Sequence, residues 1–571
     1  MLVLLLAFWL QTPPAFTGEA ERAWAEREKT VGRLTTPETL RERQAEIRRK
    51  MAMEIGGLPE ARTPLNAKSK PLFEREGYRV EGVAFESLPG FVVTANLYVP
   101  TRGAGPYPAV LGVAGHSDAG KADATYQRAW ITLARRGYVV LAFDPPGQGE
   151  RIDPNGPGAG VPEHIRHGHS CLLTGTAFAR YEIWDGIRAF DYLLTRPEVD
   201  ERRIAVAGNS GGGTQAAYLA VFEPRLAAVV ASCYTTRWRE LWSGPGPQDA
   251  EQVFPGFVRD GFDFSDFLLA FAPRPLLVTS AGQDFFPIAG ARASYEEARG
   301  WYERMDAPGR LRFFEYDDPH GWSLPRREAA YRFFAEHLKG VKDEEPEKAL
   351  EVEPAEALRT GFWNGRTVFD LCRERAEEMY PRRKAPRASP EELRAMVRKR
   401  LGLAAESSAR KRAGDFGSLK PGVLVVGDVE TAPDDSRIVM RVVPQGFEAK
   451  LPERGRGYDA GYQFAARALL VGQTALGTQV GEVLEALKKL RATPGVGRIT
   501  IEGRGAGAIL ALFAGAAEGE AVREEDPPFG SYMEVVRNQK VRVPATLVVP
   551  GILEDFDLDD LRAGARKSGN R

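Results

Sequence analysis

The segment Gly208–Gly212 reads Gly-Asn-Ser-Gly-Gly and places a serine where its hydroxyl could act as a nucleophile. The apolar stretch Arg203–Ala207 precedes it, and an alanine-rich stretch follows. A sharp strand-to-helix turn, allowed by the small residues, would lift the Ser210 hydroxyl above the edge of a sheet. The same turn would leave the Gly211 N–H free to bind an oxyanion. The pattern therefore predicts nucleophilic catalysis by Ser210, in preference to a glycine-rich turn with an incidental serine.

A serine nucleophile requires a base to accept the hydroxyl proton and an acid to orient that base. His320 and Asp284 each follow a predicted strand, so both could reach the sheet edge where Ser210 is expected. The other histidine after Ser210, His337, lies in an amphipathic stretch and is predicted to pack or to face solvent. Four nearby carboxylates remain alternatives to Asp284: Asp263, Asp266, Asp317 and Asp318.

A second oxyanion donor is expected in the loop that follows the apolar stretch Ala109–Val113. The backbone N–H of His116 is the favoured donor, and that of Ser117 is the next. The ring of His116 could take part in the chemistry or only pack at the pocket rim. Trp238 and Trp242 could line a pocket for an acyl group or a sugar, or could pack in the core.

Three histidines lie close together in sequence, at His164, His167 and His169, and could bind a metal ion. Their spacing matches no known pair of metal ligands on one helical face. Pro162 and Gly168 favour a loop at this place. We therefore predict that the histidines are structural or line a pocket, and that the protein uses no metal and no cofactor.

The composition is that of an ordinary globular protein, with 43% hydrophobic and 27% charged residues among 571. The formal net charge of −1 gives no basic surface for nucleic acid or an anionic membrane. At roughly 100–200 residues per domain, the length predicts more than one domain. The cysteines Cys171, Cys233 and Cys372 fit no zinc motif or disulfide framework and are predicted to be buried free thiols.

The N-terminus begins with the apolar run Met1–Leu10, which is shorter than the about 20 residues needed to span a bilayer. Such a run is typical of a secretory signal and predicts a periplasmic or extracellular protein. No basic residue precedes the run, and no Ala-x-Ala cleavage site follows it. A membrane tether and a misassigned start are therefore the alternatives.

The elements that must position these residues begin near residue 76, where short apolar segments alternate with amphipathic ones. Tyr78–Phe85 and Gly90–Val99 predict a hairpin. The later predicted strands are Ala109–Val113, Tyr138–Phe143, Arg203–Ala207, Leu226–Ser232, Pro275–Ser280 and Arg310–Tyr316. Helical patterns between them predict a mostly parallel sheet covered by helices on both faces.

Several of these segments resemble a known family. Val139–Arg151, VVLAFDPPGQGER, resembles the strand-and-turn signature of α/β-hydrolases. Ile183–Gly213 and the segments around Asp284 and His320 are similar to bacterial acetyl xylan esterases and dienelactone-hydrolase-like enzymes. The resemblance covers about residues 76–340. It implies an α/β-hydrolase fold and cofactor-free hydrolysis of small carboxylic esters, such as acetyl groups on plant polysaccharide.

The function predicted from these features is that of a serine carboxylic ester hydrolase acting through an acyl-enzyme. Its partner would be a small ester or an acylated carbohydrate, and the oligomeric state is left open. One departure concerns the substrate: the cephalosporin-deacetylase type of acetyl xylan esterase usually carries Gln after the serine, where this chain has Gly211. The alternatives are a carbon–carbon or lactone hydrolase, a non-catalytic carbohydrate-binding protein, and a prolyl-oligopeptidase-type peptidase, for whose propeller the roughly 55 residues before Gly77 are too few.

A second copy of the fold is predicted from an internal repeat. Leu469–Ala508 aligns with Leu172–Gly213 with a gap of two residues, and places Gly505 where the first copy has its serine. The segment VPATLVVPGILEDF resembles the strand before the acid and places Asp555 near the position of Asp284. No histidine follows in this copy, so it is predicted to be a truncated, inactive hydrolase-like domain that packs on the first or binds glycan.

The predicted domain organisation follows from these boundaries. The segments are a signal peptide over 1–18, a helical segment over 19–75, a catalytic α/β-hydrolase domain over 76–341, an acidic linker over 342–356, a second helical segment over 357–420 and a degenerate α/β-hydrolase-like domain over 421–571.

Overall fold

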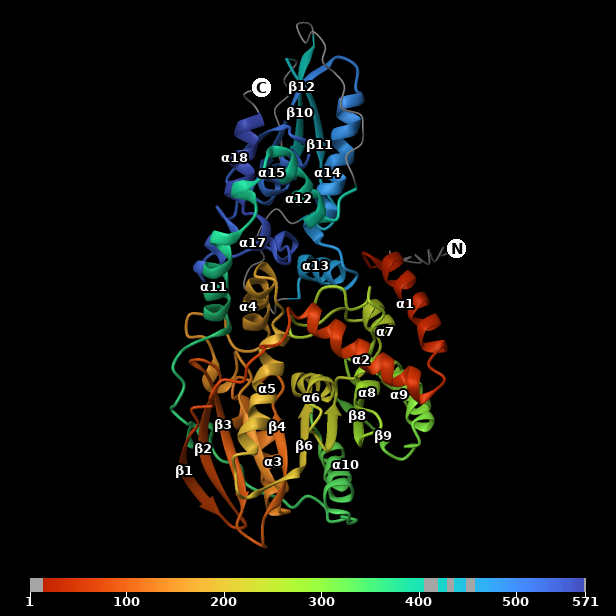
Figure 1. Cartoon of the computed structure of the whole chain (residues 1–571), viewed down its shortest axis with the longest axis vertical. Helices are drawn as coiled ribbons and strands as arrows, with labels where there is room; N and C mark the ends of the chain where they lie inside the picture. The colour runs from red at the N-terminus through yellow and green to blue at the C-terminus, as the bar shows by residue number, and fades with distance from the viewer. Residues whose placement is uncertain (1–13, 405–418, 429–435, 448–457, 569–571) are drawn as a thin grey trace, which may run out of the picture.

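A computed structural model of the chain describes residues 14–404, 419–428, 436–447 and 458–568. Most of the predicted signal peptide, residues 1–13, lies outside these described residues. The molecule is elongated, with a large sheet at one end and a smaller sheet at the other (Figure 1). No described helix is long and apolar enough to cross a membrane.

The larger sheet has nine strands in the order β1-β2-β3-β5-β4-β6-β7-β8-β9. The first four in this order pair antiparallel, and every pairing from β5 to β9 is parallel. This arrangement confirms the predicted hairpin and the mostly parallel sheet. The strands are β1 (Lys68–Arg75), β2 (Tyr78–Leu88), β3 (Phe91–Pro100), β4 (Tyr107–Val113), β5 (Val139–Phe143), β6 (Val199–Asn209), β7 (Ala228–Ser232), β8 (Leu276–Gln283) and β9 (Leu311–Pro319).

Helices cover both faces of this sheet, which explains why the central strands β5 and β7 are buried throughout. The helices of this part are α1 (Thr17–Gly32), α2 (Pro37–Glu54), α3 (Ala124–Arg135), α4 (Val161–Leu173), α5 (Ala179–Leu193), α6 (Gly211–Phe222), α7 (Trp238–Ser243), α8 (Phe264–Phe271), α9 (Ile288–Arg304) and α10 (Leu324–Phe334). Trp130 of α3 and Phe334 of α10 pack in one core cluster, whereas Phe190 of α5 and Leu219 of α6 pack in another.

The smaller sheet has four parallel strands in the order β11-β10-β12-β13. They are β10 (Lys420–Val426), β11 (Ile438–Val442), β12 (Val496–Arg504) and β13 (Ala521–Glu525). The order repeats the central β5-β4-β6-β7 of the larger sheet, which confirms the predicted second α/β-hydrolase-like domain. Its helices are α11 (Val368–Met379), α12 (Pro390–Leu401), α13 (Ala460–Leu470), α14 (Ala475–Ala492), α15 (Ala506–Glu518), α16 (Tyr532–Arg537), α17 (Ile552–Asp555) and α18 (Leu558–Ser568).

One predicted element of the second domain is wrong. The segment expected to form the strand before its acid contains a short 3₁₀ turn, Ala545–Leu547, and helix α17. In the described stretch from 526 to 568 no further strand joins the sheet, which ends at β13. Asp555 therefore lies at the end of a helix and has no strand to place it as β8 places Asp284.

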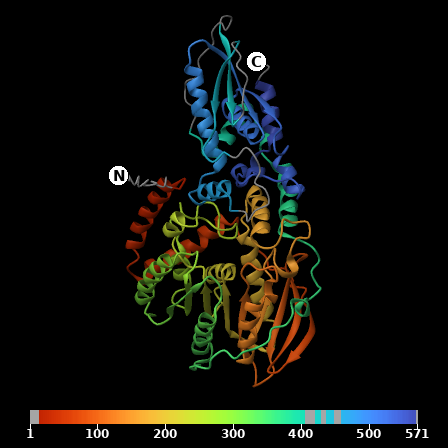
Figure 2. The same cartoon turned by 180° about the vertical axis from the view of Figure 1, so that it is seen from behind.

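The predicted linker is packed against the larger sheet. Residues 340–367 run from the end of α10 past α3 to α11 and include a 3₁₀ turn at Ala355–Leu358 (Figure 2). Arg75 of β1 pairs with Glu353 at 2.8 Å, and the Asn96 side chain of β3 donates to the Leu358 carbonyl at 2.9 Å. These contacts attach the linker to the first domain.

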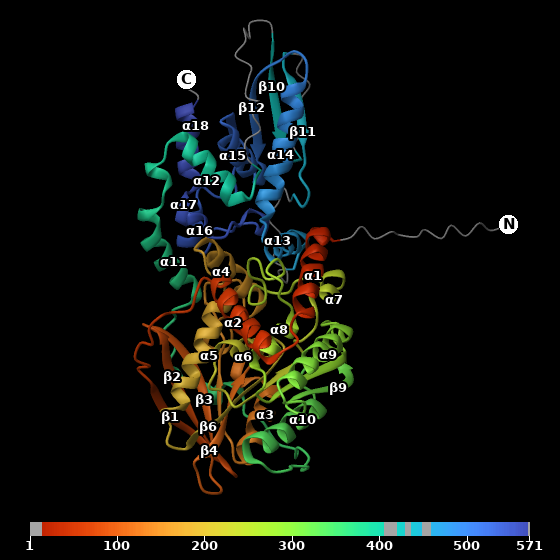
Figure 3. The ribbon, with the colours of Figure 1, turned by 45° about the vertical axis from the view of Figure 1, so that its right-hand side comes forward.

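The N-terminal helices α1 and α2 lie against the first domain near its junction with the second (Figure 3). Thr36 caps α2 by accepting from the Thr39 N–H. Arg27 of α1 and Arg43 of α2 each donate to the buried carboxylate of Asp266 in α8, at 2.9 Å and 3.0 Å. One carboxylate therefore ties three helices together.

Replacing Asp266 with alanine is expected to lower the free energy of unfolding by about 3–5 kcal/mol, because two buried guanidinium groups lose their shared counter-ion. Urea denaturation of the full chain measures the effect. The control is Glu19→Ala, which breaks an exposed pair with Arg22 and should change stability by less than about 1 kcal/mol. Equal stability of the two variants would show that the Asp266 carboxylate does not hold the helices.

Candidate active site

Ser210 lies at a sharp turn between β6 and α6, with φ 60° and ψ −125°. A Cβ added at Gly208 would come 2.3 Å from the Gly212 carbonyl oxygen, and one at Gly212 would come 2.2 Å from the Val113 carbonyl oxygen. Only glycine fits either position, so both are needed for the turn. The unusual backbone conformation of Ser210 is the strained geometry expected of a nucleophile at such a turn.

The structure brings together the three residues predicted to form a triad. The Nε2 of His320 lies 2.9 Å from the Ser210 Oγ. On its other side, the His320 Nδ1 lies 2.8 Å and 2.9 Å from the two carboxylate oxygens of Asp284. The carboxylate is buried, whereas a quarter of the histidine side chain is exposed. Strands β8 and β9 deliver the acid and the histidine at the edge where β6 delivers the serine.

The other candidate carboxylates have partners elsewhere. Asp263 caps α8, and Asp266 joins the helices described above. The remaining two accept hydrogen bonds from nearby side chains: Asp317 from Gln283 and Asp318 from Arg326. Asp284 is the carboxylate among the five that contacts the histidine.

The predicted oxyanion donors are placed by the loop after β4. The N–H of Ser117 donates to the Gln148 side chain at 2.7 Å. Among the residues that the structure describes, no hydrogen bond engages the backbone N–H of His116 or of Gly211. These two groups are thus available to a substrate oxygen, and Ser117 is not.

Trp238 and Trp242 are both buried. Trp238 packs on Phe257 and Phe264, with ring centroids 6.1 Å and 5.4 Å away. The Trp242 Nε1 donates to the Thr17 Oγ1 at 3.1 Å. The structure favours the packing role that the sequence left open for both rings.

Sequence reasoning missed two residues beside the triad. The ring of Phe285 lies 4.4 Å from that of His320, and this residue is 44% exposed. The Sγ of Cys233 lies within 4.8 Å of the ligand atoms of Asp284 and His320. Burial and the charge of Asp284 raise the pKa of the Cys233 thiol to about 12, so this thiol stays protonated and does not compete as a nucleophile.

The ring of His116 belongs to a cluster that the sequence did not predict. Its Nε2 lies 2.7 Å from the Asp249 Oδ2 and 3.2 Å from the His164 Nδ1. The Glu251 Oε1 lies 3.9 Å from the same nitrogen. Although burial opposes it, the charges of Glu251 and Asp249 raise the pKa of His116 to about 9. The cluster therefore favours positive charge at its centre.

The three histidines that are close in sequence have separate surroundings. They lie on helix α4, so the predicted loop at this place is wrong. His164 joins the cluster with His116, whereas the His167 Nε2 lies 3.3 Å from Asp153. His169 lines a pocket on another side of the helix.

Helix α13 of the second domain holds the loop that carries Asp249 and Glu251. The Tyr462 hydroxyl donates to the Gln248 carbonyl at 2.6 Å. The backbone of the same loop also bonds that of α13, because the Gly256 N–H donates to a carbonyl of this helix at 2.7 Å. The second domain thus packs directly on a loop of the site.

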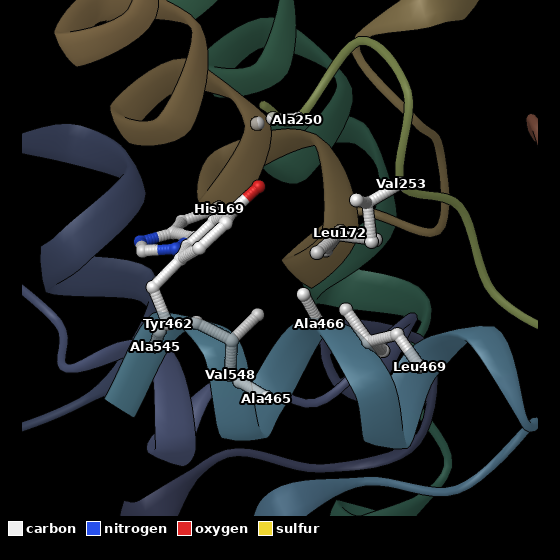
Figure 4. A pocket seen from close by; sticks show the side chains of 11 residues that line it. His169, Leu172, Ala250, Val253, Tyr462, Ala465, Ala466, Leu469, Ala545 and Val548 are labelled. Carbon is white, nitrogen blue, oxygen red and sulfur yellow. The ribbon is translucent and has the colours of Figure 1, made fainter. Parts of the chain in front are cut away.

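A small apolar pocket marks the contact between the two domains (Figure 4). Its walls come from α4, from the loop after α7, from α13 and from the 3₁₀ turn near Ala545. The labelled side chains are His169, Leu172, Ala250, Val253, Tyr462, Ala465, Ala466, Leu469, Ala545 and Val548. The pocket borders the cluster, since Ala250 stands between its two carboxylates in sequence.

The same backbone turn occurs in the second domain without its hydroxyl. Gly505 has φ 57° and ψ −127°, within a few degrees of Ser210. The Asp555 carboxylate, expected near an acid position, accepts from the Lys384 Nζ at 2.7 Å and the Arg400 Nε at 2.8 Å. Asp555 thus pairs with two basic side chains and with no histidine, which agrees with the predicted inactivity of the second copy.

Replacing Asp555 with asparagine is expected to leave turnover unchanged and to lower the free energy of unfolding by about 1.5–3 kcal/mol, because charged hydrogen bonds between helices are lost. Ester hydrolysis and urea denaturation measure the two effects. The exposed Asp428→Asn variant should change neither. Loss of turnover in a folded Asp555→Asn protein would contradict the inactivity of this domain.

Comparisons with known proteins identify the family of the chain. The sequence profile of the Abhydrolase family matches residues 30–307. The Bacillus subtilis protein YtaP, whose name describes it as a hydrolase, is 30% identical over 307 residues, which are 52% of this chain and 100% of that protein. The chain belongs to the Abhydrolase family. The profile of this family spans both Ser210 and Asp284 in the chain, and His320 lies just beyond it.

Other relatives of this Abhydrolase-family chain share less. An uncharacterized protein of Pseudomonas aeruginosa is 31% identical over 178 residues, which are 31% of this chain and 42% of that protein. Among solved structures, the methylesterase BT1017 has a TM-score of 0.46 at 24% identity, covering 59% of this chain and 73% of that one. A glucuronoyl esterase from Solibacter usitatus has a TM-score of 0.41 at 17% identity, covering 53% and 93%.

Proposed function

We propose that the protein is a serine carboxylic ester hydrolase that acts through an acyl-enzyme. The observation that carries the proposal is the continuous line of hydrogen bonds from the Ser210 Oγ through His320 to Asp284, with distances of 2.8–2.9 Å. The serine is held in a strained turn, and two free N–H groups lie nearby, one at the start of α6 and one in the loop after β4. Nucleophile, base, orienting acid and oxyanion donors are the parts that acyl transfer requires.

In the proposed mechanism His320 accepts the Ser210 proton while the hydroxyl attacks the ester carbonyl. The N–H groups of Gly211 and His116 bind the oxyanion, and the alcohol leaves with the proton from the imidazolium. His320 then activates a water molecule that hydrolyses the acyl-enzyme. Asp284 holds the Nδ1 proton throughout, which leaves Nε2 to exchange protons with the reacting groups.

The proposed substrates are small acyl esters, with acetylated carbohydrate as the natural class. Support comes from the sequence resemblance to acetyl xylan esterases and from the exposed ring of Phe285 beside His320, which offers an apolar surface to a sugar or an acyl group. The substrate class is thus inferred from residues around the triad, and is separate from the assignment of the triad itself.

A panel of substrates tests the proposed function. It contains p-nitrophenyl esters from acetate to octanoate, acetylated xylan, a methyl glucuronate ester and a peptide amide. We expect acetyl esters to be cleaved with the highest kcat/KM and the amide not at all. Cleavage of the amide with no ester activity would favour the peptidase alternative, and labelling by a fluorophosphonate probe would separate any enzyme from a binding protein.

A further inference from the structure

Four metal-ligating side chains from three separate segments converge at one point beside the proposed oxyanion site. They are His116 from the loop after β4, His164 from α4, and Asp249 and Glu251 from the loop after α7. Their ligand atoms all lie within 4.8 Å of one another. His164 and both carboxylates are buried, and only the His116 ring reaches solvent, with 22% of its side chain exposed.

The hydrogen bonds of His164 fix the orientation of its ring. Its Nε2 lies 2.9 Å from the carbonyl oxygen of Pro146, which can only accept, so Nε2 carries the proton. The Nδ1 of the ring faces the Asp249 Oδ2, 2.9 Å away. A metal ion bound there would take the place of the proton between these two atoms.

The spacing of the four groups fits a metal ion. The measured distances run from 2.7 Å to 3.9 Å: His116 to Asp249, His164 to Asp249, His116 to His164, and each ring to Glu251. Ligands held at about 2.0–2.1 Å around a tetrahedral ion are about 3.3 Å apart. Two neutral imidazoles and two carboxylates would also balance the charge of a divalent ion.

The surrounding contacts are those that orient metal ligands. The Nε2 proton of His164 is held by the Pro146 carbonyl, as second-shell acceptors hold metal-bound imidazoles. The Glu251 N–H donates to the Asp249 Oδ1 at 2.7 Å and leaves Oδ2 to face the rings. The Gln252 side chain donates to the Glu251 Oε1 at 3.2 Å. Each of the two loop carboxylates is thus held in place by the loop itself.

We propose that His116, His164, Asp249 and Glu251 bind one divalent transition-metal ion, with Zn²⁺ the best match to a two-nitrogen, two-oxygen site. This departs from the expectation of a metal-free protein. The donor set and the small ligand number favour Zn²⁺ over Ca²⁺ and Mg²⁺, which take six or more oxygen ligands.

The position of the cluster gives the ion a function that rests on the proposed hydrolase activity. A Cβ built on Gly211 would lie 3.1 Å from the Glu251 Oε1 and 3.2 Å from the His116 Cε1. The ion would therefore lie behind the two N–H groups assigned to the oxyanion and would hold in place the segments that carry them. Donors fixed in this way bind an oxyanion without reorganisation during the reaction.

The test uses the full-length chain carrying Ser210→Ala, so that metal binding is measured apart from hydrolysis. The protein is stripped with a chelator, and zinc chloride alone is titrated in a calorimeter. We expect about one Zn²⁺ per chain and X-ray absorption distances of about 2.0–2.2 Å to nitrogen and oxygen ligands. Binding below about 0.1 equivalent, or sulfur in the ligand shell, would overturn the proposal.

Two variants on the same background locate the site. Asp249→Asn removes a ligand charge and should weaken zinc binding by about 100-fold or more. His169→Gln changes a histidine of the same helix that lines the pocket between the domains, and should bind zinc as the parent does. If Asp249→Asn is unfolded by circular dichroism, the His116→Gln variant replaces it. Equal binding by the ligand variant and the His169→Gln control would overturn the assignment.

The metal proposal and the hydrolase proposal can fail independently. Zinc binding with no esterase activity in the wild-type chain would support the metal site and overturn its role in ester hydrolysis. Esterase activity in a chain that binds no zinc would support the triad and overturn the metal site, and the four side chains would then be joined by hydrogen bonds alone. Restoration of kcat by zinc in the stripped wild-type enzyme, with KM little changed, is the result expected if the ion stabilises the oxyanion.

Discussion

Replacing Ser210 with alanine is expected to lower kcat for p-nitrophenyl acetate by about 10⁴–10⁶-fold. The reason is that no other group at the turn can form the acyl-enzyme, since Cys233 is a buried, protonated thiol. The residual rate would come from the oxyanion donors and from substrate binding. Initial rates with purified full-length protein measure the effect.

Two controls test whether a loss of activity is due to the missing Ser210 hydroxyl. The exposed Ser69→Ala variant, on the edge strand β1, should retain full activity. A fluorophosphonate probe should label the wild-type chain stoichiometrically and leave the Ser210→Ala chain unlabelled. Substantial turnover by a folded Ser210→Ala protein would refute the assignment of the nucleophile.

Replacing Asp284 with asparagine is expected to lower kcat by about 10⁴-fold while the protein stays folded. The asparagine amide would donate a hydrogen bond toward His320 Nδ1, which now faces the carboxylate at 2.8 Å. That nitrogen would become the acceptor, so Nε2 would carry the proton and could not accept one from Ser210.

Asp317→Asn is the matched control for this variant, because Asp317 lies at the end of the neighbouring strand β9 and bonds Gln283. Its kcat should equal that of the wild-type chain. If both asparagine variants lost activity to the same extent, the effect would belong to the strand ends in general, and Asp284 would not be the orienting acid.

The triad could be predicted because each member follows from a short local pattern. Ser210 needs glycines on both sides, and their loss would bring a side chain to within 2.3 Å of the neighbouring backbone. Asp284 and His320 each follow an apolar strand of a parallel sheet, so their positions follow from the strand order. The backbone turn at Gly505 was predictable for the same reason, since β12 and α15 repeat the pattern of β6 and α6.

The cluster of His116, His164, Asp249 and Glu251 was not predictable, because its members meet only through tertiary packing. Pro162 and Gly168 suggested a loop, yet Pro162 lies in the first turn of α4, where proline is favoured. Gly168 lies inside the helix, and only glycine fits there, because a Cβ would come 2.5 Å from the Ala250 side chain. The glycine allows close packing against the loop that brings Asp249 to His164, and no local pattern reports that contact.

The prediction of a strand before Asp555 in the second copy was wrong for a related reason. The run from Val543 to Pro550 is apolar, as a buried strand would be, but its residues pack into the junction between domains. Val548 and Ala545 line the pocket beside α13. Burial alone therefore produced the strand-like composition, and periodicity could not distinguish the two environments.

The packing of α13 on the loop before α8 has a consequence for the order of synthesis. The Tyr462 hydroxyl and the Gln248 carbonyl that it bonds are 214 residues apart. At the usual rate of chain elongation, the ribosome needs about 10–40 s to add that many residues. During this interval the nascent first domain has a triad but no partner for the loop that carries Asp249 and Glu251. The second domain, which lacks the serine, thus sets the moment at which the newly made protein can complete its site.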